Sequence, residues 1–206
     1  MSHFDDKAAT WDDDPDHLKR AKIIANRLVK AIEKSDVKSA LEYGSGTGLL
    51  SFELRNDFPK IMLMDESVNM TCVAMQKCND LGVNNLFPIK YDLMRNPLHF
   101  GRYDLIYSQL TLHHIENTLG ILKKFHQLLN PGGLLALIDL EQEDGSFHDY
   151  EFRGHHGFER KELEKKLKKI GFSAEHFEVC YTIEKELEEG QVRGYPLFLM
   201  VARKLI

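Results

Sequence analysis

The sequence has few cysteines and none of the pairs that would indicate a cross-linked or metal-bound scaffold. Its 206 residues include three cysteines, at positions 72, 78 and 180. Structural disulfide frameworks and cysteine zinc sites need paired cysteines at characteristic spacings, and no CxxC pair occurs here. Cys72 and Cys78, six residues apart on a predicted helix, should lie on different faces. We therefore expect reduced, mostly buried thiols and no metal site.

Long hydrophobic runs and a secretory leader are also absent. No apolar stretch approaches the roughly 20 residues that cross a bilayer. The acidic segment MSHFDDKAATWDDD lacks the apolar core of a signal peptide. These absences favour a cytoplasmic protein without membrane partners.

Excess positive charge is the third missing feature, since the formal net charge is −5. Proteins that bind nucleic acids usually present a basic face to the phosphates. The dense basic run from Arg160 to Lys169 is interrupted by Glu162 and Glu164, which is typical of a solvated helix face. Charge therefore argues against DNA or RNA as a partner.

Short apolar runs alternate with helical patterns along the chain, which predicts one α/β domain of parallel strands joined by helical crossovers. Helices are expected over residues 15–33, 49–56, 67–82, 117–129 and 158–170, and strands over 39–43, 61–65, 86–91, 104–108, 134–140, 176–184 and 196–204. The first helix should bury a stripe made of Leu18, Ala21, Ala25, Leu28, Val29 and Ile32.

Some local features refine this outline. Pro88 suits an edge strand, because proline has no amide hydrogen to donate to a neighbouring strand. Residues 141–157 read as an irregular insertion. The charged stretch Lys185 to Gly194 separates the last two strands, which should form an antiparallel hairpin.

A glycine loop, Glu42-Tyr43-Gly44-Ser45-Gly46-Thr47-Gly48, joins the first predicted strand to a helix. Such a loop lets a ligand approach bare backbone and a helix N-terminus. The dinucleotide fingerprint GxGxxG would need a third glycine where Leu49 stands. Asp65, about twenty residues later, ends the second strand, where a carboxylate can accept hydrogen bonds from ribose hydroxyls. The pattern indicates a nucleoside-containing ligand and, by itself, does not choose between cofactors.

Five segments in order carry a family resemblance. The glycine loop, Met64-Asp65-Glu66-Ser67-Val68-Asn69-Met70, Tyr91-Asp92-Leu93, Tyr103 to Ser108 and Leu129-Asn130-Pro131-Gly132-Gly133 resemble the motifs of class I S-adenosylmethionine-dependent methyltransferases of the small-molecule type. The resemblance covers about residues 35–140. It implies a Rossmann-like seven-stranded, mostly parallel sheet in the order 3-2-1-4-5-7-6, with strand 7 antiparallel and helices on both faces. It also implies S-adenosylmethionine as cofactor.

The same resemblance implies roles for single residues. Glu42 and the backbone of Gly44 to Gly46 would hold the methionine end of the cofactor, Asp65 the ribose, and Asp92 with Leu93 the adenine. Ser108 would line the methionine portion. The motifs also place Tyr43, Ser45, Glu66 and Met70 in the cofactor site. The segment from Phe4 to Trp11 resembles a mobile cap, in which Trp11 contacts the cofactor; the alternative is that Trp11 only packs on the domain surface.

The acceptor is less well indicated. Enzymes that methylate DNA bases or glutamine amides often carry an Asn/Asp-Pro-Pro-Tyr/Phe motif after strand four, where this chain has Ser108 to His114. The resemblance instead favours a small-molecule O, N, S or C nucleophile. A histidine could remove a proton from a hydroxyl or thiol, and His113 and His156 are the first candidates, although structural packing is the alternative for each.

The sequence therefore predicts a methyltransferase that is a monomer or homodimer. One domain should comprise a cap and helix (residues 1–33), a cofactor-binding core (35–140) and an acceptor-side part (141–206). Two alternatives stay open: a catalytically silent adenosylmethionine-binding partner subunit, and an NAD-dependent oxidoreductase, which Leu49 disfavours.

Overall fold

A seven-stranded sheet organises the chain in the computed structural model, which describes residues 4–32, 37–98, 101–148, 151–186 and 190–206. Its strands are β1 (Ala40–Tyr43), β2 (Ile61–Asp65), β3 (Leu86–Lys90), β4 (Tyr103–Gln109), β5 (Leu129–Leu140), β6 (Phe172–Glu186) and β7 (Val192–Lys204). The order is β3-β2-β1-β4-β5-β7-β6, and β7 runs antiparallel to both β5 and β6. The predicted topology is confirmed, and Pro88 lies in the edge strand β3.

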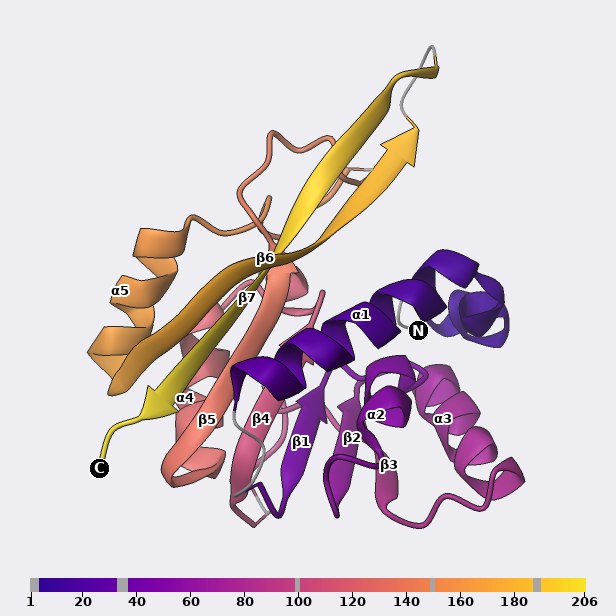
Figure 1. Ribbon diagram of the computed structural model, residues 1–206, viewed down its shortest axis with the longest axis horizontal. Coiled ribbons are helices and arrows are strands. Elements are labelled where there is room, and N and C mark those ends of the chain that lie inside the picture. Colours follow the sequence, from indigo (N-terminus) through magenta and orange to yellow (C-terminus); the bar gives the residue numbers. More distant parts are fainter. Residues whose placement is uncertain (1–3, 33–36, 99–100, 149–150, 187–189) are drawn as a thin grey trace.

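Helices cover both faces of the sheet, as predicted (Figure 1). One face carries α1 (Pro15–Ala31), α2 (Leu49–Leu54) and α3 (Val68–Asp80), and the other carries α4 (Thr118–Leu128) and α5 (Arg160–Ile170). Neighbouring strand residues alternate between the two cores: Leu105 packs in the first and Ile106 in the second. Because both faces are buried, the central strands read as continuous apolar runs.

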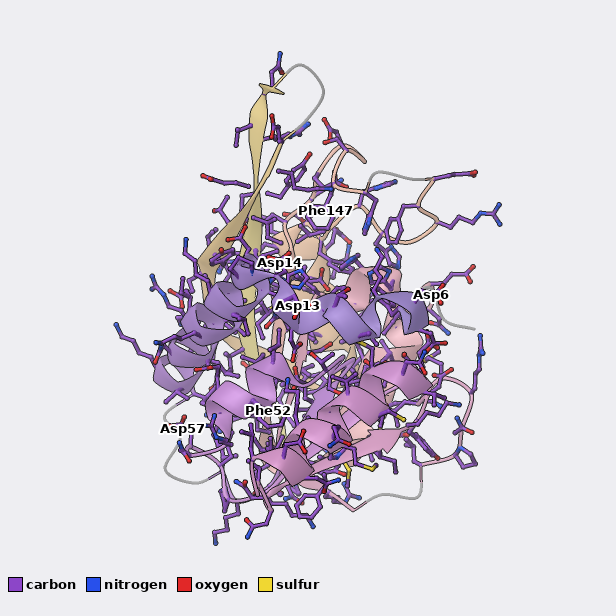
Figure 2. The ribbon with its side chains drawn as sticks, turned by 90° about the vertical axis from the view of Figure 1, so that its right-hand side faces the viewer. Asp6, Asp13, Asp14, Phe52, Asp57 and Phe147 are labelled. Atoms are coloured by element: carbon purple, nitrogen blue, oxygen red, sulfur yellow. The ribbon has the colours of Figure 1, made fainter. Side chains whose placement is uncertain are left out.

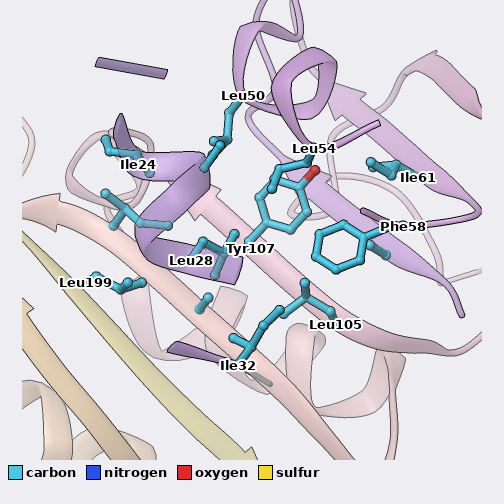
Figure 3. Packing of buried hydrophobic residues seen from close by; sticks show 14 of the residues in the cluster. Ile24, Leu28, Ile32, Leu50, Leu54, Phe58, Ile61, Leu105, Tyr107 and Leu199 are labelled. Carbon is cyan, nitrogen blue, oxygen red and sulfur yellow. The ribbon is translucent and has the colours of Figure 1, made fainter. Parts of the chain in front are cut away.

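The core under α1 is closely packed around Tyr107 of β4. Figure 3 shows its ring among Leu28, Leu54 and Phe58, with the hydroxyl directed toward α2. That hydroxyl lies 2.6 Å from Ser51 Oγ, so the polar atom is satisfied inside an apolar layer. The ring anchors α1 and α2 to the middle of the sheet.

The predicted apolar stripe of α1 is wrong at Leu18, whose exposed fraction is 47%. The buried residues of the helix are Arg20, Ala21, Ile24, Ala25 and Leu28. The first turn of α1 extends past the sheet, so the buried face begins at Arg20 and includes Ile24. Residue 33, the last of the predicted helix, lies outside the described residues.

The two C-terminal strands are longer than predicted. β6 and β7 stay paired from Phe172 with Lys204 to Glu186 with Val192, so much of the stretch expected to separate them is strand. Beyond the sheet the hairpin projects from the body of the molecule (Figure 1). The projecting part of the hairpin carries many charged residues, because the paired strands cover no apolar core there. Residues 187–189 of the predicted connection lie outside the described part of the chain.

An additional helical segment precedes α1, in the part of the chain that resembles a mobile cap. It is the 3₁₀ helix η1 (Asp5–Asp13). None of the helices in the described residues is long and apolar enough to cross a membrane.

Asp104, near the start of β4, ties three segments together. Its Oδ2 accepts hydrogen bonds from the backbone N of Lys38 and of Ser39, both at 3.0 Å, and from Ser39 Oγ at 3.1 Å. Its Oδ1 accepts one from Asn130 Nδ2 at 2.7 Å. Burial opposes ionisation, but these hydrogen bonds outweigh it and lower the pKa of Asp104.

We predict that Asp104→Ala lowers the free energy of unfolding by roughly 2–4 kcal/mol at pH 7, because several donors lose a charged acceptor. A carboxylate whose pKa is lowered by folding stabilises the folded state above its unfolded pKa and loses that effect as the pH falls. The deficit should therefore shrink below about pH 4. Urea unfolding at several pH values measures this. Asp80→Ala, at the exposed end of α3, is the control, and equal stability of the two variants at pH 7 would contradict the assignment.

Candidate functional site

A cavity of about 980 Å³ opens at the carboxyl ends of the central strands. β1 pairs with β2 on one side and with β4 on the other, so the order of the sheet reverses there. Ligands of open α/β sheets bind at such a switch point, because the loops that follow adjacent strands diverge. The cavity therefore lies at the edge of the sheet where the glycine loop and Asp65 follow β1 and β2.

Most of the predicted site residues line this cavity. Those that do are Trp11, Glu42, Tyr43, Gly44, Ser45, Gly46, Asp65, Glu66, Met70, Asp92 and His113. Three predicted residues are not in its lining. Leu93 is fully buried in the second core, Ser108 donates a hydrogen bond to the Tyr43 carbonyl at 2.9 Å, and His156 pairs with Glu143. Leu93 and Ser108 thus support the walls.

The glycine loop turns sharply against β2 and β4. The amides of Gly44 and Ser45 both donate to the Met64 carbonyl, at 2.8 and 3.2 Å. Gly44 has φ +72°, and a Cβ there would lie 2.1 Å from Thr111 Oγ1. Gly46 has φ +54°, and the nearest atom to a Cβ there would be Met70 Sδ at 3.9 Å. The first glycine is required by crowding, whereas the second leaves room at the cavity wall.

Asp65 links the loop to the end of β2. Its Oδ2 accepts a hydrogen bond from the Gly46 amide at 2.7 Å, and its Oδ1 accepts one from the Ser67 amide at 2.8 Å. Burial raises the pKa of this carboxyl group despite those hydrogen bonds. The Ser67 hydroxyl accepts a hydrogen bond from the Met70 amide and caps α3. Asp65 therefore fixes the loop while it faces the cavity.

Asp92 lies on the opposite wall, after β3. Its Oδ1 accepts a hydrogen bond from the Met94 amide at 2.7 Å, and its Oδ2 lies 3.3 Å from Arg95 Nε. The carboxylates of Asp65 and Asp92 thus stand at the ends of neighbouring strands, with Glu66 also lining the cavity between them. This half of the cavity is acidic.

Glu42, at the end of β1, is 3% exposed. Burial raises the pKa of its carboxyl group to about 8, against the opposing hydrogen bond from Ser51 Oγ. Ser51 in turn contacts the Tyr107 hydroxyl. Burial therefore favours the neutral form of Glu42.

The segment η1 is fastened across one side of the cavity. Asp5 Oδ1 accepts a hydrogen bond from Ser67 Oγ at 2.5 Å. Asp12 accepts one from Thr47 Oγ1 at 2.5 Å and pairs with Lys77 Nζ at 2.6 Å. In the view of Figure 2, the labelled Asp13 and Asp14 stand between Phe52 of α2 and Phe147 of the insertion. The segment therefore bridges the glycine loop and α3.

Aromatic contacts continue this cover over the other half of the cavity. The ring of Phe4 meets His114 with centroids 5.2 Å apart, and the ring of Trp11 lies 4.4 Å from that of His17. Phe4, Trp11, His17 and His114 all line the cavity. Trp11 is thus a wall residue of the cavity, in the position that a cap would require.

His113 forms a buried pair with Asp139 of β5. Its Nδ1 lies 2.6 Å from Asp139 Oδ1, and the two side chains are 2% and 1% exposed. The His113 amide also donates to Asp139 Oδ2 at 3.2 Å. The carboxylate therefore fixes both the backbone and the ring, and leaves Nε2 as the ring nitrogen for other contacts.

Arg20 and His148 are among the wall residues that the sequence did not indicate. Arg20 is 8% exposed, and its Nε has no hydrogen-bond partner among the described residues. Burial lowers its pKa. Arg20 is one of several basic residues of the amphipathic helix α1, and no signal in the sequence distinguished it from the others. His148, in the irregular insertion, had no local pattern to mark it; burial and the adjacent His113 lower its pKa to about 4.

Comparison with known proteins identifies a family that shares this fold. The family model described as "Methyltransferase domain" matches residues 16–177. An S-adenosylmethionine-dependent methyltransferase from Aquifex aeolicus has a similar structure, with a TM-score of 0.68 and 21% identity, over 96% of this chain and 97% of that one.

Curated relatives match over part of their length. A malonyl-[acyl-carrier protein] O-methyltransferase of Marinomonas sp. is 27% identical over 144 residues, which is 68% of this chain and 50% of that protein. A tRNA U34 carboxymethyltransferase of Desulforapulum autotrophicum is 29% identical over 121 residues, 57% of this chain and 37% of that protein. The chain thus spans half or less of the length of these two relatives.

We predict that Glu42→Gln removes a pH dependence of stability. An acid whose pKa is raised by folding stabilises the folded state below its unfolded pKa, and this effect is lost as the pH rises through the folded pKa. Wild type should lose roughly 2–4 kcal/mol between pH 5 and pH 9 through this group. The amide of the variant cannot ionise, so the variant should be the more stable protein at pH 9. Thermal melts across this range test it, with the exposed Glu53→Gln as control; parallel curves would refute the assignment.

Proposed function

This chain belongs to the class I S-adenosylmethionine-dependent methyltransferase family, and on that premise we propose that it methylates an O, N, S or C nucleophile of a small molecule. The family uses S-adenosylmethionine as methyl donor. The observation that carries the proposal is the cavity in which the glycine loop, Asp65, Asp92 and His113 meet. It joins a donor half to an acceptor half.

In the donor half, the residues fit the chemical groups of the cofactor. Asp65 would accept hydrogen bonds from the ribose hydroxyls, and Asp92 with the Leu93 backbone would hold the adenine. Gly46 leaves room at the wall for the methionine end. When bound, the cofactor supplies a methyl group on a cationic sulfur. The chain's own part is to bind, orient and exclude water.

Two buried ionisable groups fit the charges of the same cofactor. Arg20 has no ion-pair partner among the described residues. Its guanidinium can bind a carboxylate such as that of the methionine moiety. Glu42 offers a carboxyl group to the cationic end. Tyr43, Ser45, Glu66 and Met70 complete the wall around them. On binding, the buried Arg20 would acquire a counter-charge, and the cationic end of the cofactor would favour ionisation of Glu42.

In the acceptor half, His113 is the base that we propose for a hydroxyl or thiol acceptor. Its Nε2 would take the proton while Asp139 holds Nδ1 and stabilises the charged ring. His156, the second candidate from the sequence, does not line the cavity and is paired with Glu143. We therefore prefer His113.

A small acceptor is favoured over RNA. One relative is named for a tRNA substrate, and another for an acyl-carrier-protein substrate. The net charge of −5 and the acidic donor half oppose binding to a polyanion. In this proposal the chain is one domain, in which residues 1–33 cover the site, residues 35–140 bind the donor and residues 141–206 shape the acceptor side. The protein is a monomer or homodimer. Within these ranges, residues 1–3, 33, 35–36, 99–100, 149–150 and 187–189 lie outside the described part.

The first experiment is incubation of the pure protein with methyl-labelled S-adenosylmethionine and a panel of small alcohols, thiols, amines and carboxylic acids, with bulk tRNA in a parallel arm. Transfer to a member of the panel supports the proposal. Transfer to tRNA alone overturns it. If the chain binds the cofactor but transfers no methyl group, and a partner protein restores the transfer, the result favours the alternative of a silent binding subunit.

We predict that Asp65→Ala weakens binding of S-adenosylmethionine by about 10- to 100-fold, which corresponds to the roughly 1–3 kcal/mol lost when polar partners are left unsatisfied. The variant loses both the ribose acceptor and the anchor of the Gly46 amide. Isothermal titration calorimetry measures the affinity. Glu53→Ala, exposed on α2, should bind as wild type does, and an unchanged affinity of Asp65→Ala would show that the ribose assignment is wrong.

We also predict that His113→Gln lowers kcat by about 10²- to 10⁴-fold for a hydroxyl or thiol acceptor, the range for loss of a general base. Affinity for S-adenosylmethionine should change less than about threefold, because His113 lies outside the donor half. Asp139→Asn should lower kcat too, because the ring loses the carboxylate that orients it. Steady-state kinetics with calorimetry separates the two effects; a His113→Gln variant with wild-type kcat would remove His113 from the chemistry.

A further inference from the structure

Three imidazole rings converge on the acceptor side of the cavity, and we infer that His113, His114 and His148 form a binding site for one divalent ion of the Zn²⁺ type. His113 and His114 come from the short 3₁₀ helix η3 (Leu112–His114) after β4, and His148 comes from the insertion after β5. All three line the cavity. We expected no metal site because of the spacing of the cysteines. That spacing carries no information on three histidines so far apart in the sequence.

The geometry brings one ring nitrogen of each histidine within 4.8 Å of the others. The ring centroids of His113 lie 4.1 Å from His114 and 5.4 Å from His148, and the latter two are 5.6 Å apart. A tetrahedral zinc ion with Zn–N bonds near 2.0–2.1 Å needs nitrogens about 3.4 Å apart. Side-chain rotation of the partly exposed His114 and His148 covers the difference, while Asp139 holds His113 in place.

His113 supplies the strongest evidence for a ligand. Its side chain is 2% exposed, yet Nε2 has no hydrogen-bond partner among the described residues. A buried polar atom without a partner is costly, and few remain so in folded proteins. The opposite nitrogen, Nδ1, is held by Asp139 at 2.6 Å. A carboxylate on one ring nitrogen and a metal ion on the other is the usual arrangement of a ligating histidine.

The donor set indicates the class of ion. Three neutral imidazoles without a carboxylate or thiolate suit Zn²⁺, Cu²⁺ or Ni²⁺ and disfavour Mg²⁺ and Ca²⁺, which prefer oxygen. Among the described residues, His113, His114 and His148 are the one group of this kind. Three protein ligands leave a fourth position, as in catalytic zinc sites. Because all three line the cavity, that position can face a bound acceptor.

An ion here would change how an acceptor loses its proton. A hydroxyl or thiol that binds the ion ionises more easily, and its proton passes to water. In that case His113 acts as a ligand of the ion instead of as the base. This consequence rests on the proposed function. Binding of the ion does not, since it depends only on the three imidazoles.

Aromatic packing is the competing explanation of the cluster. The ring of Phe152 stacks on that of His148 with centroids 3.7 Å apart, and Phe147 meets His113 at 6.4 Å. Imidazoles that serve only as flat rings would bind no ion.

The test is titration of the chelator-treated full chain with Zn²⁺ by calorimetry, and with Co²⁺ by visible absorption. We expect one ion per chain and the intense absorption of tetrahedral cobalt. His114→Ala and His148→Ala should each weaken Zn²⁺ binding at least about 100-fold, since each removes one of three ligands. Asp139→Asn should weaken it about 10- to 100-fold, the effect of losing the partner of a ligating histidine. His176→Ala, on β6 outside the cluster, should bind as wild type does.

Folding is monitored in the same proteins. His114 and His148 are partly exposed, so their alanine variants should melt near wild type. Wild type that binds no Zn²⁺, or folded variants that bind it as tightly as wild type, would overturn the metal site. The readout is metal binding, so a failure of methyl transfer does not affect this result. Likewise, a failure to bind metal does not affect the test of methyl transfer.

Discussion

The parallel pairing of β1 with both β2 and β4 is the constraint on which the rest of the structure depends. It brings the ends of these strands to one edge, so that Glu42, Asp65 and the η3 turn after β4 face a common space. The same register lets the amides of Gly44 and Ser45 donate to the Met64 carbonyl. A shift of one residue would turn the apolar side chains of β1 from one core to the other and move the loop away from Asp65.

The donor half could be read from the sequence because its motifs are local. A strand, a glycine turn and a helix cap are each encoded within a few residues, and the buried strands show as apolar runs. Ser67 illustrates this: it accepts a hydrogen bond from the amide of Met70, three residues later, and so caps the start of α3. The seven-stranded order followed from the resemblance of five such segments, and the structure has the same order.

The acceptor half could not be read in this way, because its residues meet only through tertiary structure. His113 and Asp139 are 26 positions apart and share no motif. His148 lies in a stretch without periodicity. Leu18 and Arg20 show a related limit: composition favours leucine inside and arginine outside, but Leu18 is 47% exposed and Arg20 is 8% exposed. Periodicity alone does not tell where a helix leaves the core.

The segment η1 touches both halves of the cavity at once. Asp5 binds Ser67 beside the donor half, while Phe4 packs against His114 in the acceptor half. Adjacent residues of one backbone therefore hold contacts on both sides of the cavity. If binding in one half alters these contacts and so the affinity of the other half, thermodynamic linkage makes the effect reciprocal by the same factor. Phe4 and the nine residues of η1 are the part of the chain through which such an effect would pass.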